Sequence, residues 1–334
     1  MAPVSNRSLV CFITSLVVLF AGDAVYAQST GAPILLERAP LRSATNVDTG
    51  FAKVTLTIAG HNRVFYLHRP APLPPAPMPL VLVFHGGAGN GAQIAKMTGM
   101  DRAANLHGFA AAYPETDQHW QDGRETTGLG AADIDFVRAI IDWSIKTQGI
   151  DRSRIFATGI SNGGIFTLRL ACEMSREIAG FAAVAGSMGS MLAPRCRPQR
   201  AVPLMLIHGD KDEWVRWQGG AVKQLAGGGA GGDVIPVPQT LDFWRGINHC
   251  AAKAPTIEKI NRDSRDGTRV EIHRYGNCEK PTELVLIKGG GHTWPGADNG
   301  NSRLLRRLVG RTSQDINATE TILAFFENSG RYIR

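Results

Sequence analysis

The stretch GISNGG, Gly159 to Gly164, lies between two apolar segments with different periods. The residues before it, RIFAT from Arg154, form a short apolar run typical of a buried strand, whereas IFTLRLAC from Ile165 has helical spacing. A serine at a strand-to-helix turn with glycine on both sides is typical of an exposed nucleophile, because the backbone bends sharply there. The alternative is that Ser161 only caps the helix, which needs no flanking glycine. The glycines therefore favour the nucleophile.

The rest of the chain continues this alternation of strands and helices. Short apolar runs predict strands at 79–84, 109–113, 154–160, 181–186, 203–208, 270–275 and 283–288. Helical periods occur at 133–147, from 162, at 239–247 and at 319–329. Such alternation predicts an α/β fold with a doubly wound, mostly parallel sheet, in one domain over residues 51–334.

Two segments before the first buried run differ from this pattern. VTLTI from Val54 and VFYLH from Val64 alternate in polarity around the turn AGHN, which predicts an antiparallel hairpin at a sheet edge. The proline-rich segment 69–79 that follows is expected to be an extended surface connection, because proline disfavours both helix and central strand. It is too short to separate two domains.

The first 27 residues resemble a secretory signal peptide. Arg7 precedes an apolar core from Leu9 to Ala21, and the small residues ending at Ala27 suit cleavage there. The alternative is a membrane anchor, but this run is shorter than the roughly 20 residues that a spanning helix needs. We therefore expect a secreted or periplasmic protein with no stable membrane insertion, which begins with an irregular arm over residues 28–50.

Cysteine usage fits an oxidising compartment. Removing the signal takes away one cysteine and leaves four, Cys172, Cys196, Cys250 and Cys278, for which three pairings are possible. Pairing of sequence neighbours, Cys172 with Cys196 and Cys250 with Cys278, closes two loops worth roughly 3 kcal/mol each in the chain-entropy model. The alternative is four buried free thiols. No cysteine or histidine spacing predicts a metal site.

Composition and charge exclude other classes of protein. With 43% hydrophobic and 19% charged residues, the chain is neither disordered nor fibrous. Its net charge of +7 is carried by scattered basic residues without an interleaved aromatic stripe, so we expect a solvated basic surface and no nucleic-acid partner. The sequence leaves the oligomeric state open.

A nucleophilic serine needs a histidine base and an acid that orients it. Of the three histidines after the candidate acid region, His292 follows a predicted strand through three glycines, which let a loop carry its ring toward Ser161. His249 lies at a helix end and His273 within a strand. In HGDKDEW from 208 to 214, Asp212 is the favoured acid, since Asp210 is close enough to the strand end to bond its own turn.

Stabilisation of an oxyanion requires N–H donors beside the nucleophile. HGGAGNG, His85 to Gly91, follows a predicted strand, and its glycines allow close approach of the backbone. Gly87 is the favoured donor from this loop, with Gly86 next, and the second donor is Asn162, the residue after the serine. A phosphate-binding loop is the alternative, but no GKS or GKT follows.

Five motifs in order resemble the secreted polyhydroxybutyrate-depolymerase-like esterases, a family related to the feruloyl esterases. They are HGGAGNG, YPETDQHW, RIFATGISNGG with RLAC, HGDKDEW and GGGHTWPG, and the similarity spans about Val64 to Gly296. The resemblance implies an α/β-hydrolase fold in which Ser161, Asp212 and His292 cleave carboxylic esters without a metal or organic cofactor. It also implies a disulfide between Cys250 and Cys278.

One segment departs from the family pattern and suggests a substrate site. The loop after the acid reads DEWVRW here, so Trp214 and Trp217 are candidates for an aromatic acyl or polymer site, with packing as the alternative. Trp120 and Trp294 are further candidates for the substrate site, again with packing as the alternative. We expect polyhydroxybutyrate-type oligoesters or small esters as substrates; a feruloyl or acetyl esterase, a serine peptidase and a non-catalytic binding protein are the alternatives, in that order.

Overall fold

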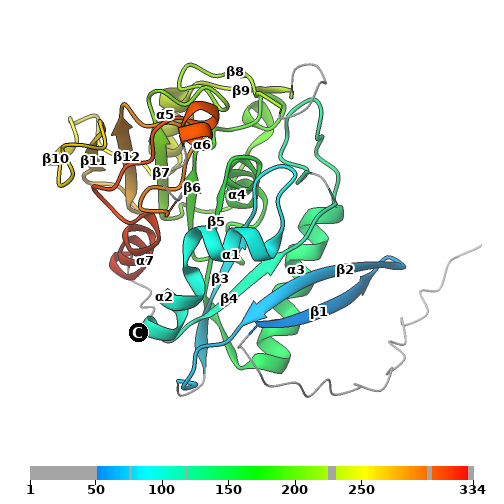
Figure 1. The fold of residues 1–334 in the computed structure, drawn as a ribbon. Helices are drawn as coiled ribbons and strands as arrows, with labels where there is room; N and C mark the ends of the chain where they lie inside the picture. Colours follow the sequence, from blue (N-terminus) through cyan, green and yellow to red (C-terminus); the bar gives the residue numbers. More distant parts are fainter. Residues whose placement is uncertain (1–50, 75–76, 118, 225–230, 299–302, 330–334) are drawn as a thin grey trace, which may run out of the picture. The chain divides into compact units, whose positions relative to one another are not determined.

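A ten-stranded sheet forms the centre of the protein (Figure 1). The structure, a computed structural model, describes residues 51–74, 77–117, 119–224, 231–298 and 303–329, so the predicted signal peptide and arm lie outside the described residues. The strand order is β1-β2-β4-β3-β5-β6-β7-β12-β11-β10, and neighbours from β4 to β12 in this order run parallel. The prediction of a mostly parallel sheet is therefore confirmed. The strands are β1 Phe51–Ile58, β2 His61–His68, β3 Met78–Phe84, β4 Ala110–Pro114, β5 Ile150–Ile160, β6 Gly180–Val184, β7 Leu204–Gly209, β10 Thr256–Ile260, β11 Arg269–Tyr275 and β12 Thr282–Lys288.

Helices cover both faces of the sheet, as expected for a doubly wound fold. In β3, Leu80 and Leu82 belong to one core and Val81 and Val83 to the other, which is the two-residue period of a strand buried on both sides. Helices α3, α4 and α5 contribute to the first core, and α1, α2 and α7 to the second. The helices are α1 Gly91–Thr98, α2 Met100–His107, α3 Ala132–Gln148, α4 Asn162–Glu173, α5 Val237–Ile247, α6 Arg303–Val309 and α7 Ala318–Asn328.

The N-terminal hairpin lies at one edge of the sheet, as predicted. Strands β1 and β2 pair antiparallel along their whole length, and β2 continues antiparallel onto β4. The turn consists of Ala59 and Gly60, whose φ angles of 47° and 81° match the left-handed conformations that tight hairpin turns require. The opposite edge is formed by β10, which was not predicted because its side chains are mostly exposed and lack an alternating apolar pattern.

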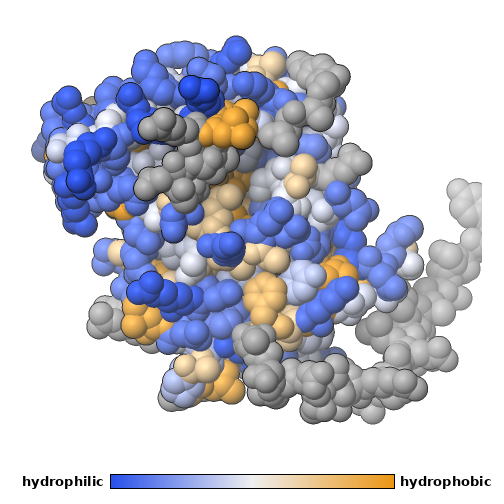
Figure 2. Space-filling model, viewed as in Figure 1, coloured by the Kyte–Doolittle hydropathy of each residue, from blue (hydrophilic) through white to orange (hydrophobic). Residues whose placement is uncertain are grey.

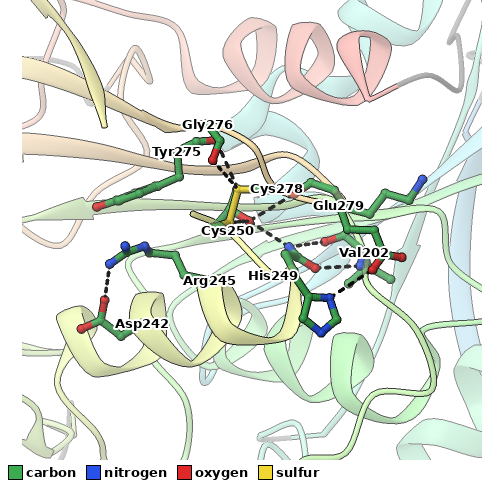
Figure 3. The surroundings of a disulfide bond; sticks show 12 residues. Val202, Asp242, Arg245, His249, Cys250, Tyr275, Gly276, Cys278 and Glu279 are labelled. Carbon is green, nitrogen blue, oxygen red and sulfur yellow. Dashed lines mark hydrogen bonds and ion pairs between the residues drawn. A yellow bond between two sulfur atoms is a disulfide. The ribbon is translucent and has the colours of Figure 1, made fainter. Parts of the chain in front are cut away.

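Both predicted disulfides are present. Cys172–Cys196 joins the end of α4 to the segment after a short 3-10 helix and is buried. Cys250–Cys278 joins the residues after α5 to the connection between β11 and β12 (Figure 3). Each bond closes a loop of similar length, so both are expected to stabilise the fold by about 3 kcal/mol in the chain-entropy model.

The face of the protein drawn in Figure 2 is mostly polar. Figure 2 shows hydrophilic side chains over most of one face, with apolar side chains in small separate areas. Leu106 and Leu304 are the most exposed large apolar side chains among the described residues, at 73% and 68%. No helix in the described part of the chain has the length and apolarity needed to cross a bilayer.

Candidate active site

Ser161 occupies a strained turn between β5 and α4. Its backbone has φ 58° and ψ −126°, a conformation that a non-glycine residue adopts only at an energetic cost. Within the described residues, its hydroxyl makes no cap hydrogen bond to α4, so the geometry differs from that of a simple helix cap. Such strain is typical of a turn that presents a nucleophile above the sheet.

The glycines around Ser161 are required by close backbone contacts. A Cβ atom on Gly159 would lie 2.7 Å from the carbonyl carbon of Gly163, and one on Gly164 would lie 2.6 Å from the carbonyl oxygen of Val184. A Cβ atom on Gly163 would collide with the carbonyl oxygens of Phe84 and His85. The turn therefore packs directly against the end of β3, from which the second glycine motif begins.

Replacing Gly163 with alanine is expected to destabilise the fold by roughly 1–3 kcal/mol, because backbone atoms cannot move aside cheaply. Gly246→Ala is the matched control, since a Cβ atom there meets nothing within 4 Å and alanine favours helix by up to about 1 kcal/mol. Denaturant unfolding measures both changes. Equal free energies of unfolding for Gly163→Ala and wild type would contradict this prediction. They would mean that the turn and β3 can move apart at little cost.

A buried carboxylate and a histidine form a hydrogen-bonded pair after β7 and β12. The Nδ1 atom of His292 lies 2.7 Å from Oδ2 of Asp212, whose other oxygen accepts the N–H groups of Trp214 and Val215 at 2.8 and 2.9 Å. The side chains of Asp212 and His292 are 0% and 9% exposed. Burial acts to raise the pKa of Asp212, but attraction to His292 and the hydrogen bonds outweigh it, so this pKa lies below its usual range. The carboxylate is therefore ionised and holds the imidazole.

The loops that carry this pair are joined by backbone hydrogen bonds. The N–H of Lys211 donates to the carbonyl of Gly290 at 2.9 Å, and the N–H of Gly289 donates to Oδ1 of Asp210 at 2.6 Å. Asp210 therefore binds the loop of His292, which corrects the prediction that it bonds its own turn. Sequence spacing alone did not show this, because the partner is 79 residues away.

The three candidate residues lie at one edge of the sheet. Ser161 follows β5, Asp212 follows β7 and His292 follows β12, and these strands belong to one run of parallel neighbours. The carboxyl ends of parallel strands meet at the same edge, where α/β proteins place their sites. Among the described residues no hydrogen bond joins Ser161 to His292.

The other two histidines late in the chain have different partners. His249 pairs with Glu279 near a disulfide (Figure 3), and His273 pairs with Glu271.

The glycine loop after β3 lies against the serine. A Cβ atom on Gly86 would be 3.3 Å from Cβ of Ser161, whereas one on Gly87 would be 2.7 Å from Nε2 of His119. Asn162 begins α4, and its side chain is buried. Both predicted N–H donors thus belong to segments that flank Ser161.

The four candidate tryptophans have different environments. Trp120 and Trp294 are fully buried, and the Nε1–H group of Trp294 donates to Thr319 inside the core. Packing was the alternative for these two residues, and their burial favours it over a place in the lining of a substrate site. Trp214 is half-buried and stacks on the ring of His292, with 5.8 Å between centroids, and Trp217 packs at the edge of the core.

His208 is a polar residue of this site that the sequence did not single out. Its ring is buried, with Nε2 2.8 Å from the carbonyl oxygen of Val215 and 3.7 Å from Oδ2 of Asp212. Burial lowers the pKa of His208, so the ring is neutral beside the carboxylate. In the sequence His208 ends the apolar strand before the acid loop, and that position did not show that its side chain would lie beside Asp212.

In the described ranges no group of three or more potential ligands has metal-binding geometry.

Comparison with known proteins places the chain in a family. A sequence model described as "Esterase PHB depolymerase" matches residues 63–221. NocK of Nocardia uniformis subsp. tsuyamanensis, whose name describes it as an esterase, is 31% identical over 303 residues, covering 87% of this chain and 85% of NocK. The chain belongs to the polyhydroxybutyrate-depolymerase-like esterase family. This esterase is a carboxylic ester hydrolase of the serine type.

Two further similarities concern proteins that act on xylan. The bifunctional acetylxylan esterase/xylanase XynS20E of Neocallimastix patriciarum is 28% identical over 242 residues, which are 72% of this esterase and only 32% of XynS20E. The structure of acetyl xylan esterase from Aspergillus awamori superposes with a TM-score of 0.51 and 17% identity over 75% of this chain and 96% of that one. This second similarity confirms the predicted α/β-hydrolase fold.

Proposed function

We propose that Ser161, Asp212 and His292 are the catalytic residues of this esterase. The observation that carries the proposal is the strained Ser161 turn at the same sheet edge as the buried Asp212–His292 pair. A serine hydroxyl is a weak nucleophile at neutral pH and needs a base, and a base needs an acid that orients it. The Asp212–His292 pair has the geometry of such a base and acid.

The reaction follows from these positions. His292 takes the proton of Ser161 as the serine oxygen attacks the ester carbonyl, and Asp212 stabilises the imidazolium. The backbone N–H groups of Gly87 and Asn162 bind the oxyanion, and the dipole of α4 favours the negative charge. Collapse breaks the ester bond, and the imidazolium of His292 gives its proton to the leaving alcohol oxygen. The neutral ring then takes a proton from the water that attacks the acyl-enzyme and returns it to the Ser161 oxygen as the acid product leaves.

The substrates that we propose are polyhydroxybutyrate-type oligoesters or small esters. The description of the matching family supports the first class, and the aromatic surface of Trp214 beside His292 suits an apolar acyl group. Acetyl or feruloyl esters of plant polysaccharide are the second candidate, supported by the similarity to XynS20E, whose name includes an acetylxylan esterase activity.

A panel of esters tests this assignment. The mature protein is assayed with hydroxybutyrate oligomers, acetylated xylan and a hydroxycinnamate ester, with Ser161→Ala as the control for background hydrolysis. We expect the highest kcat/KM on the hydroxybutyrate oligomers. Preference for acetylated xylan or the hydroxycinnamate would support the second candidate. Cleavage of peptides together with no cleavage of any ester would overturn both substrate classes.

We also propose that the esterase acts outside the reducing cytoplasm. The two disulfides support this location, since such bonds persist in oxidising compartments. The predicted signal peptide supports it as well. Cell fractionation followed by N-terminal sequencing of the mature protein tests both points, and a retained N-terminus in the cytoplasm would contradict them.

A further inference from the structure

Trp120 makes hydrogen bonds to both segments that supply the proposed oxyanion donors. Its indole Nε1–H donates to the carbonyl oxygen of His85 at 3.0 Å, directly before Gly86 and Gly87. Its backbone N–H donates to Oδ1 of Asn162 at 2.7 Å, and its carbonyl accepts from Nδ2 of Asn162 at 3.0 Å. One residue thus holds the loop after β3 and the start of α4 at the same time.

A buried ion pair two residues after Trp120 also holds Asn162. Nδ2 of Asn162 also donates to Oδ2 of Asp122, at 2.6 Å. Asp122 forms a salt bridge of 2.8 Å with Arg124, and both side chains are almost fully buried, at 0% and 3% exposed. Because a buried ion pair resists rearrangement, it keeps the backbone of residues 120–122 in place against Asn162.

We propose that Trp120 is a positioning residue that holds the Gly87 and Asn162 N–H groups at the separation an oxyanion requires. The inference rests on the proposed function, because it assumes that these two groups are the oxyanion donors. Donors accelerate the reaction only if they are in place before charge develops, and removal of one donor typically costs about 100- to 1,000-fold in kcat. Loss of the bond that fixes a donor is expected to cost less than loss of the donor itself.

Packing alone is the competing explanation for Trp120. Its ring stacks on Phe166, with 5.2 Å between centroids, and meets the ring of Phe84 edge-on at 5.3 Å. A role in packing needs the ring but not its N–H group, whereas a positioning role needs the N–H group. A substitution that removes only this group therefore separates the two.

Trp120→Phe and Trp244→Phe form a matched pair for the test. Both tryptophans are fully buried, but Nε1 of Trp244 has no hydrogen-bond partner among the described residues. Both variants lose ring volume, and only Trp120→Phe loses an indole hydrogen bond. We expect kcat on a soluble ester to fall about tenfold or more in Trp120→Phe, with KM within about twofold of the wild-type value. A misplaced donor stabilises the transition state less well but changes the binding of the substrate little.

Labelling with a fluorophosphonate separates rate from folding. The final extent of labelling counts the competent active sites, and the labelling rate reports the oxyanion donors. We expect a slower rate with full extent in Trp120→Phe and wild-type values in Trp244→Phe. If both variants lose the same fraction of kcat per labelled site, the packing explanation holds and the inference is overturned.

A second substitution keeps the test valid if the phenylalanine variant folds poorly. Site-specific replacement of Trp120 by benzothienylalanine exchanges the indole N–H group for sulfur and retains the ring shape. We expect the same loss of kcat from this variant, and unchanged kcat would overturn the inference. Failure of wild type to hydrolyse esters or to be labelled at Ser161 would instead contradict the proposed function.

Discussion

Replacing Ser161 with alanine is expected to lower kcat for ester hydrolysis by roughly a million-fold. The hydroxyl is the only group in the proposed mechanism that forms a bond to the substrate, so no neighbouring group replaces it. Initial rates on a soluble ester measure the loss, and a fluorophosphonate should label wild type but not the variant.

Ser144→Ala is the matched control for this substitution. Ser144 lies in α3 and its hydroxyl is buried without a hydrogen-bond partner among the described residues, so its removal tests loss of a buried hydroxyl outside the site. We expect wild-type rates from it. Ester hydrolysis that survives in Ser161→Ala above one thousandth of the wild-type kcat would assign the nucleophile to another residue.

Replacing Asp212 with asparagine is expected to lower kcat about 10,000-fold, as in other triads of this kind. The amide keeps the shape of the carboxylate but loses the charge that stabilises the imidazolium. Its NH₂ group also favours the wrong tautomer of His292. Because the pKa of Asp212 lies below its usual range, the wild-type group remains ionised at neutral pH, so the variant changes charge as well as hydrogen bonding.

Glu213→Gln controls for the loss of one negative charge from the same loop. Glu213 is the exposed neighbour of Asp212 and is expected to contribute little to kcat. Steady-state kinetics on one ester, together with circular dichroism to verify folding, compares the two variants. A loss below about tenfold in Asp212→Asn would mean that His292 does not depend on this acid.

Local patterns explain why much of the fold is predictable from the sequence. Strand β3 is apolar on both faces, and α4 follows directly after the glycine turn, so strand and helix periods identify them without knowledge of their neighbours. Strand β10 lacks such a pattern because it lies at a sheet edge with exposed side chains. An edge strand tolerates polar residues because its side chains reach solvent. For the same reason its sequence lacks the apolar pattern that predicts a strand.

The tryptophans show the limit of the same reasoning in the candidate site. Trp120 and Trp294 lie within motifs that flank the candidate residues, and proximity in sequence suggested proximity to a substrate. The structure places both rings in the core. Direction of a loop side chain depends on contacts with distant segments, which no local pattern encodes.

The sequence by itself determined the α/β class, the hairpin, the glycine turn around Ser161 and the choice of Asp212 and His292 as candidates, since each depends on residue types at short spacing. Only the tertiary structure decided that Asp210 binds the loop of His292, that His208 lies beside Asp212, and that Trp120 joins two segments of the site. Those contacts link residues that are far apart in the chain or whose side-chain directions are set by packing. They exist only once the sheet has brought its strand ends together.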